Sequence, residues 1–456
     1  MTISNDPARA VERTYLTLTL LTTLASSFIW GINTIFLLDA GLSNAEAFAA
    51  NAFFTVGMVV FEVPTGIVAD TRGRRLSYVL GSVTLLFATL LYFAMWQVQA
   101  PLWGWAIASI LLGLGFTFFS GATEAWLVDA LDATGFEGHL DHVFGRAQTV
   151  SGVAVLIGSV AGGVIAQVTN LGVPYLVRAG MLGLSMLVAL RFMHDIGFTP
   201  QRDVSTLKAM RNVARGAVDG GFRNPPVRWL MLAIPFTAGT GIYIFYASQP
   251  YLLELFGDPN AYSIAGLAAA IFAGVQIVAG LLVPRVRRLF RRRTDAVLGG
   301  SVLGIGILAL LGLSPPFVVA LALLAGWSFI GAVARPMRSA FLNGVIPSEQ
   351  RATVLSFDSL MGSAGGLVAQ PILGRVADAS GYATSYLVSA GIQCLALPFV
   401  LLARREQAAS DPIVADEPSE GGATLHAGRL RGGPALYRSA PHQERANTCL
   451  TMSIPT

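Results

Sequence analysis

The feature that most constrains this chain is a series of long apolar segments joined by short polar connections. As helices, segments of about 20 residues cross a hydrocarbon core of about 30 Å. The expected spans are residues 14–38, 44–69, 76–97, 102–128, 148–169, 173–193, 229–253, 261–284, 295–313, 316–334, 354–374 and 383–403. The sequence therefore predicts an all-α polytopic membrane protein with twelve transmembrane helices.

Composition and charge agree with a membrane location. The chain is 54% hydrophobic and only 12% charged, about half the charge of a soluble domain. Of its 30 Lys and Arg residues, 24 lie near helix ends on one side of the predicted membrane, and this bias places both termini in the cytoplasm. We expect a multi-pass protein of the plasma (inner) membrane of a bacterium, with the lipid bilayer as its surroundings. The net charge of +4 reports topology, and nucleic acid is not an expected partner.

An internal repeat divides the chain into two halves. Residues 36–39 resemble residues 251–254, and residues 175–180 resemble residues 386–391 without gaps. The repeat predicts two six-helix halves in parallel orientation. The expected division is a cytoplasmic tail (1–13), a first bundle (14–195), a cytoplasmic linker (196–228), a second bundle (229–403) and a disordered tail (404–456). In the linker, the spacing of Lys208, Arg211 and Arg215 predicts a helix lying along the membrane surface.

Motifs for catalysis and nucleotide binding are missing from the sequence. The only lysine is Lys208, and no glycine-rich loop precedes it, so a phosphate-binding motif of the P-loop type is absent. The two cysteines, Cys394 and Cys449, form no disulfide framework. We expect no enzyme activity, no cofactor and no metal site, and uphill transport would have to draw on an ion gradient.

The connection Gly66–Arg75 contains an acid, a turn glycine and three arginines. Its pattern, Gly-x-x-x-Asp-x-x-Gly-Arg-Arg, resembles the signature loop between helices 2 and 3 of the major facilitator superfamily. Residues 62–65 before it are similar to exporter-like members of that family. The resemblance implies two six-helix bundles with a substrate site between them, and Gly66 and Gly73 as signature glycines. An ordinary cytoplasmic hairpin is the alternative.

A second resemblance concerns the direction of transport. Gly158, Gly162 and Gly163 resemble the antiporter signature of the superfamily, with Ser159 in place of its proline. In that family the signature accompanies export. Small residues also pack close helix pairs in any membrane bundle, and this is the alternative.

Glu62 is the deepest acid within the predicted spans. Ionisable groups at such positions are costly and commonly functional. We predict that Glu62 loads and unloads the coupling proton. The alternatives are a permanent pair with a nearby arginine and a capping interaction at Pro64.

Charged residues of opposite sign lie near the inner ends of the two halves. They predict a cytoplasmic gate, and the resemblance implies that the signature acid meets helix 11 and that the loop arginines meet an acid ending helix 4. The gate residues are Asp70, Arg72, Arg74, Arg75, Glu124, Asp129, Arg335, Arg338 and Arg351.

The resemblance places helices 1, 4, 7 and 10 innermost, around the substrate. Their distinctive side chains are Trp30, Asn33, Phe118, Phe119, Tyr243, Tyr246, Gln249 and Trp327. This aromatic, mostly uncharged lining favours a small amphipathic or neutral organic molecule. Arg178 has two interpretations, as an anchor to headgroups or as a residue facing the cavity.

The predicted function is secondary active transport by alternating access, as proton-coupled export by a monomer. One alternative is a proton-linked importer of sugars or other metabolites, which a buried cluster of Asn, Gln and charged residues would favour. The other is a transporter-like receptor that no longer cycles.

Overall fold

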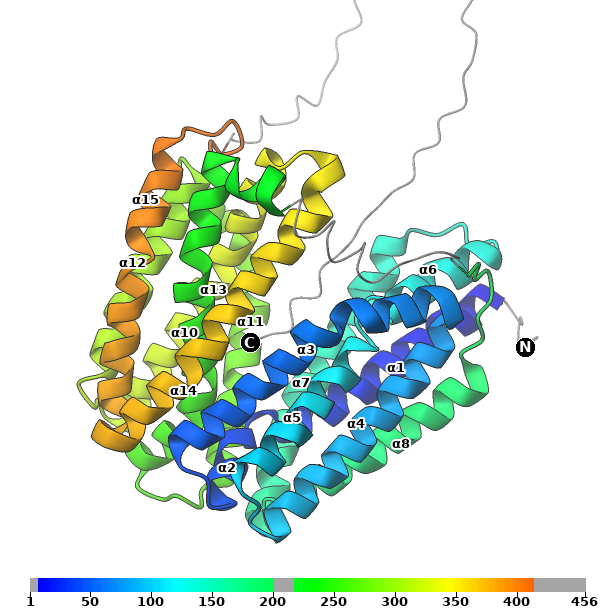
Figure 1. The fold of residues 1–456 in the computed structure, drawn as a ribbon, viewed down its shortest axis with the longest axis horizontal. Coiled ribbons are helices and arrows are strands. Elements are labelled where there is room, and N and C mark those ends of the chain that lie inside the picture. Colours follow the sequence, from blue (N-terminus) through cyan, green and yellow to red (C-terminus); the bar gives the residue numbers. More distant parts are fainter. Residues whose placement is uncertain (1–6, 201–216, 414–456) are drawn as a thin grey trace, which may run out of the picture.

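The computed structural model describes residues 7–200 and 217–413, and this part of the chain is helical (Figure 1). The helices are α1 (Pro7–Trp30), α2 (Asn33–Asp39), α3 (Asn44–Arg72), α4 (Arg74–Gln97), α5 (Leu102–Thr117), α6 (Ala122–Ala133), α7 (Leu140–Val168), α8 (Val173–Phe192), the π-helix η1 (Ala217–Phe222), α10 (Pro225–Phe256), α11 (Tyr262–Arg287), α12 (Arg293–Leu311), α13 (Phe317–Val345), α14 (Ser348–Cys394) and α15 (Leu397–Arg405).

The described helices confirm a multi-pass membrane protein. Ten helical segments are long and apolar enough to cross a membrane, or eleven when α1 and α2, which meet at 49°, count as one span. The 47 residues of α14 include a non-helical backbone at Gly381, where φ is +81°. At 1.5 Å per residue, α14 would extend about 70 Å if it were straight, more than twice the thickness of a hydrocarbon core. One helical run in this count is therefore long enough for two crossings.

The helices gather into two bundles, α1–α8 and α10–α15 (Figure 1). The bundles meet near α2 and diverge toward α6 and α15. Buried side chains explain the joined end, because the apolar cluster of the first bundle includes Leu253 and Ala265 of the second. The main apolar cluster of the second bundle likewise includes Phe48 of the first.

Several helices begin outside the predicted spans. Helix α1 starts at Pro7 within the expected tail, because Ala8 and Val11 are buried in the first bundle. Helix α10 starts at Pro225 within the expected linker. The predicted surface helix with Lys208, Arg211 and Arg215 lies outside the described residues.

The start of the expected disordered tail is also ordered. Asp411 is buried, and its carboxylate accepts hydrogen bonds from the Thr294 backbone N–H (2.9 Å) and hydroxyl (2.8 Å) at the start of α12. Ser410 donates to the Phe341 carbonyl (2.9 Å). The bond to the Thr294 N–H satisfies a free backbone group of the first turn of α12, so residues 410 and 411 pack on the second bundle.

Candidate functional site

At the joined end, an acid of the second bundle caps a helix of the first. Asp378 Oδ1 accepts from the Asn44 backbone N–H (2.8 Å), and its Oδ2 accepts from that of Ala45 (2.9 Å). These donors are among the free N–H groups of the first turn of α3, where the helix dipole also favours a negative charge. The Tyr382 hydroxyl bonds to Asn44 Oδ1. Sequence reasoning missed Asp378, which stands among small residues near the outer end of a span.

A helix break in the first bundle is bridged from the second bundle. The bend between α1 and α2 removes backbone partners from Trp30 and Thr34. Gln249 of α10 supplies them, because its Nε2 donates to the Trp30 carbonyl (2.8 Å) and its Oε1 accepts from the Thr34 N–H (2.8 Å). Gln249 is only 4% exposed. Its amide therefore bonds across the bundle interface, although the residue was expected as a cavity side chain.

The antiporter-like glycines lie at two close helix crossings. A Cβ on Gly162 would lie 1.9 Å from the Phe28 carbonyl oxygen of α1, and one on Gly158 would lie 2.5 Å from Ser27 Cβ. A Cβ on Gly163 would lie 2.7 Å from the Tyr262 carbonyl oxygen of the second bundle. All three glycines therefore lie where helix backbones approach closely.

At the diverging end, the signature loop forms its ion pairs and hydrogen bonds within the first bundle. Arg74 pairs with Asp70, and its Nε lies 3.9 Å from Asp129 Oδ2. Asp195 Oδ1 accepts from the Arg75 backbone N–H (2.8 Å). Gly73 has φ +114°, and a Cβ there would lie 2.5 Å from Asp195 Oδ2, so this turn requires glycine. A Cβ on Gly66, in contrast, would meet no atom within 4 Å.

The other predicted gate residues also stay within their halves. Arg338 forms two bonds of 2.7 Å to Asp358 of α14 and one of 3.2 Å to the Leu230 carbonyl of α10. Arg335 donates to Gln276 (3.3 Å). The remaining three are the exposed Arg72 and the half-buried Glu124 and Arg351. The expected meeting of Asp70 with helix 11 is not formed, because the bundles diverge here.

Glu62 lies on α3 beside the break between α5 and α6. Its Oε1 accepts a hydrogen bond of 2.7 Å from the Ser120 hydroxyl. Ser120 is free to donate because Gly121 adopts φ +67° and interrupts the helix. Among the described residues Glu62 makes no ion pair, so the permanent pair with an arginine is absent from this conformation.

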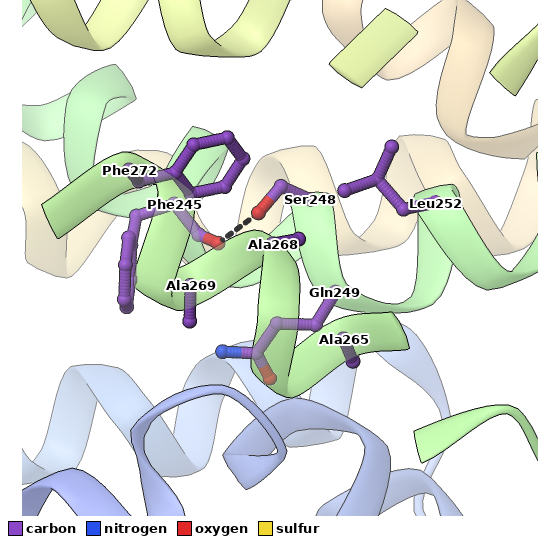
Figure 2. Close-up of a pocket in the computed structure, with 8 residues that line it drawn as sticks. All are labelled: Phe245, Ser248, Gln249, Leu252, Ala265, Ala268, Ala269 and Phe272. Atoms are coloured by element: carbon purple, nitrogen blue, oxygen red, sulfur yellow. Dashed lines mark hydrogen bonds between the residues drawn. The ribbon is translucent and has the colours of Figure 1, made fainter. Parts of the chain in front are cut away.

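Two small adjoining pockets lie in the second bundle. The first is lined by residues of α10 and α11 (Figure 2). Its lining is Phe245, Ser248, Gln249, Leu252, Ala265, Ala268, Ala269 and Phe272. The side chain of Gln249 points out of it, toward the first bundle (Figure 2). The second pocket, of about 300 Å³, adds Trp327, Gln276 and Ser328 to a wall that includes Phe245 and Ser248.

The structure brings together some of the expected cavity residues. Trp30 packs against Phe245 with ring centroids 5.6 Å apart, and Tyr246 against the same ring at 5.2 Å. Tyr243 is fully buried and donates to Ser385 (2.6 Å) inside the second bundle. Its ring also lies 4.6 Å from the ring of Phe48 of α3, so Tyr243 contacts the first bundle at the joined end.

Phe118 and Phe119 also lie apart from the pockets. Both flank Gly81 of α4, and Phe119 packs on the ring of Tyr78. They belong to the packing of the first bundle around the α5–α6 break.

A polar cluster in the first bundle was only partly anticipated. Asn33 Nδ2 donates to Asn51 Oδ1 (2.9 Å), and its own Oδ1 accepts from the Tyr175 hydroxyl (3.0 Å). One turn after Tyr175 on α8, Arg178 Nε donates to Thr89 Oγ1 of α4 (3.0 Å). The signal in the sequence was a set of polar residues on four different apolar spans. Their proximity depends on the fold.

Two helical bundles that meet at one end and diverge at the other, in a chain of apolar spans, define the class of polytopic membrane transporters. A family model of the Major Facilitator Superfamily matches residues 15–366 and 263–447. The chain belongs to the Major Facilitator Superfamily, and it is a transporter rather than an enzyme.

Solved structures of transporters are similar to the chain. The nucleoside transporter NupG has 13% identity and a TM-score of 0.72, over 86% of this chain and 98% of that chain. A bacterial homolog of the human lysosomal transporter Spinster, inward-facing and unoccupied, has 16% identity and a TM-score of 0.62, over 90% and 100%. A D-xylose-proton symporter has 16% identity and a TM-score of 0.57, over 86% of this chain and 96% of that chain. At these identities the likeness establishes the fold. No curated protein matches the chain.

Proposed function

We propose that the chain is a secondary active transporter that works by alternating access, with twelve crossings in two six-helix halves. The number follows if α1 and α2 count once, α5 and α6 count once, α14 divides at Gly381, and the second part of α14 counts once with α15. The observation that carries the proposal is the contrast between the ends of the bundle interface. Hydrogen bonds join the halves through Asp378 and Gln249, whereas the gate charges pair within each half.

The distribution of arginines supports the orientation. The diverging end contains the arginines of the α3–α4 and α11–α12 connections, and such residues favour the cytoplasm. On this assignment both termini are cytoplasmic, in the plasma (inner) membrane of a bacterium, and the conformation is open toward the cytoplasm. The Asp70 and Arg338 groups would then meet across the halves only in the opposite conformation.

Glu62 is the proposed proton carrier. Its bond to the Ser120 hydroxyl is compatible with either protonation state of the carboxyl group, because the hydroxyl can donate to a carboxylate or accept from an acid. An arginine partner would instead hold the group charged. A monomer with one such acid is the smallest unit that fits this mechanism.

For the direction of transport, we infer export of small amphipathic organic compounds. The support is the resemblance of residues 62–65 and of the α7 glycines to exporters, together with the aromatic wall around Trp30, Phe245 and Trp327. Proton-linked uptake is the second candidate, because Asn33, Asn51 and Arg178 form the kind of buried polar cluster that an importer would use.

The test is transport by the full-length protein in proteoliposomes with an imposed pH gradient, using a panel of fluorescent amphipathic dyes. We expect dye to move against the proton flow, and a protonophore to abolish the movement. Movement with the proton flow would establish uptake instead. The absence of gradient-dependent movement for the whole panel, with protein inserted in the vesicles, would contradict the proposal.

Two variants test whether Glu62 couples transport to proton movement. Glu62→Gln is expected to abolish gradient-driven movement while the protein still inserts. Glu137→Gln, in the exposed α6–α7 connection, is the control and should transport normally. Normal coupled transport by Glu62→Gln would exclude Glu62 from the mechanism.

A further inference from the structure

Arg178 is a buried cation whose charge is not neutralised by any group that the structure describes. It lies on α8 and is only 2% exposed, so it does not reach the headgroups. Its Nε donates to Thr89, while its two terminal amino groups have no hydrogen-bond partner in residues 7–200 and 217–413. Burying an arginine in this way is costly, and in membrane proteins such residues mark functional pathways.

The internal repeat indicates that the helix itself does not need the arginine. Residues 175–177 and 179–180 are identical to residues 386–388 and 390–391 of the second bundle, but Ser389 stands at the position of Arg178. Ser389 is fully buried and donates to the carbonyl of Ser385 (2.8 Å), one turn before it on the same helix. The corresponding helix of the second bundle therefore packs with a small neutral residue at this position. The charge of Arg178 is not needed for helix packing and serves another purpose.

The surroundings of Arg178 contain hydrogen-bond donors and aromatic rings. The hydroxyls of Tyr92, Tyr175 and Tyr246 are its electrostatic neighbours, and these groups are neutral at ordinary pH. The Phe116 ring centroid lies 5.8 Å from its Cζ. Since Tyr246 belongs to α10, the guanidinium lies on the side of the first bundle that faces the second.

A second donor in the same cluster also lacks an acceptor. Asn51 is 6% exposed, and its Nδ2 makes no hydrogen bond in the part of the chain that the structure describes. Hydrogen bonds join it to Asn33 and, through Asn33, to Tyr175, which lies one turn before Arg178 on α8. A buried cluster with one cation and unpaired donors is completed by an acceptor that carries a negative charge.

We propose that Arg178 binds the carboxylate of an amphipathic organic anion, whose apolar part contacts the aromatic side chains around Trp30 and Phe245. This inference rests on the proposed transport function and makes its substrate class more specific. The guanidinium can present two parallel N–H groups to a carboxylate, and Phe116, Tyr92 and Tyr246 lie beside it.

The test measures binding, so it does not depend on transport. Purified full-length protein is titrated with sodium carboxylates from acetate and benzoate to phenylacetate and indole-3-acetate, each compared with its own neutral amide. Thermal unfolding reports the affinity. We expect at least one carboxylate to bind about ten-fold or more tightly than its amide, the ratio for one charge-assisted hydrogen bond.

Variants then assign the preference to Arg178. Arg178→Ser, which copies the second half, should remove the preference for the carboxylate, and Arg178→Lys should retain part of it. Arg191→Ser, on the exposed last turn of the same helix, is the control and should bind as the wild type does. If Arg178→Ser does not fold, comparison of the Arg178→Lys and wild-type titrations still shows whether the preference for the carboxylate depends on Arg178.

Three results would overturn the inference. They are equal binding of every carboxylate and its amide by the wild type, an unchanged preference in Arg178→Ser, and an unchanged preference in Arg178→Lys. A wild-type preference without gradient-driven movement in vesicles would support the anion site and contradict the transport proposal, so the two failures are distinguishable.

Discussion

The two ends of the bundle interface are held by different kinds of interaction. At the joined end, Asp378 and Gln249 bond to backbone groups of the opposite bundle, and Gly163 allows two helix backbones to touch. At the diverging end, the charged side chains of Asp70 and Arg338 make ion pairs inside their own bundles. Backbone contacts require a fixed approach of the helices, whereas an ion pair with a partly exposed acid, such as that of Asp70, can exchange partners at little cost. The comparison suggests that the charged end is the one that changes partners.

The largest effect is expected from a methyl group at the joined end. In Gly163→Ala the new Cβ would lie 2.7 Å from a backbone oxygen of α11, so the bundles must separate or the helices must shift. We expect the free energy of unfolding to fall by about 1–3 kcal/mol, as for overpacked cores. Thermal unfolding in detergent measures this. Gly66→Ala, which meets no atom within 4 Å, is the control, and an equal loss in both variants would contradict the distinction between the ends.

Gln249→Leu removes the bridge over the α1–α2 break. It leaves the Trp30 carbonyl and the Thr34 N–H buried without these partners, at about 1–3 kcal/mol for each unsatisfied group. Part of this penalty would be relieved by opening the joined end. We expect lower thermal stability together with higher reactivity of a cysteine placed at Thr34. Gln393→Leu, which breaks a bond to Thr240 inside the second bundle, should lower stability without changing that reactivity. Equal reactivity in the two variants would contradict the bridging role.

Asp378→Ala removes a helix cap that crosses the interface. Loss of an N-terminal cap costs about 1 kcal/mol. Because Asp378 can cap α3 only when the two bundles are in contact at this end, the substitution destabilises that conformation alone. Accessibility of a cysteine at Ala45 should therefore rise about five-fold. Glu46→Ala removes the capping box that α3 forms with Ser43 inside the first bundle, and should leave accessibility near the wild-type level. A rise of the same size in both variants would mean that fraying of α3 is being measured.

The smallest effect is expected at the charged end. Arg74→Ala removes pairs with Asp70 and Asp129, in which the acids are 34% and 37% exposed. Such pairs contribute about 0.2–1 kcal/mol, so the ratio of the two conformations should change less than ten-fold. Cysteine accessibility from each side of the membrane measures the ratio, with the exposed Arg72→Ala as control. An unchanged ratio in Arg74→Ala would exclude Arg74 from the gate.

Much of the fold follows from patterns local in the sequence. Apolar length predicted nearly every helix, and the Gly66–Arg75 motif predicted the family. Boundaries were less accurate where tertiary burial extended a helix, as at Ala8 and Val11 of α1. The ordering of Asp411 was missed for a similar reason, since its partner Thr294 lies 117 residues away.

The candidate site was less predictable than the fold. Gln249 was identified as distinctive, but its partners at the α1–α2 break became visible only in the structure. Phe118 and Tyr243 have the same residue chemistry as Trp30 and Tyr246, yet Phe118 packs inside its own bundle and Tyr243 packs against Phe48 at the joined end. Which face of an apolar helix meets the other bundle depends on contacts between spans, and an all-apolar segment gives no periodic signal for it.

The sequence by itself determined that this protein is a polytopic helical membrane protein with an internal repeat, because span length, charge bias and repeat spacing are properties of contiguous residues. Only the tertiary structure decided which polar groups complete one another. Asn33, Asn51 and Tyr175 meet because three spans are packed together, and Asp378 reaches α3 because two bundles converge. In a hydrocarbon core each polar group needs a partner, and only the assembled bundle shows that Arg178 has no negatively charged partner in the part of the chain that the structure describes.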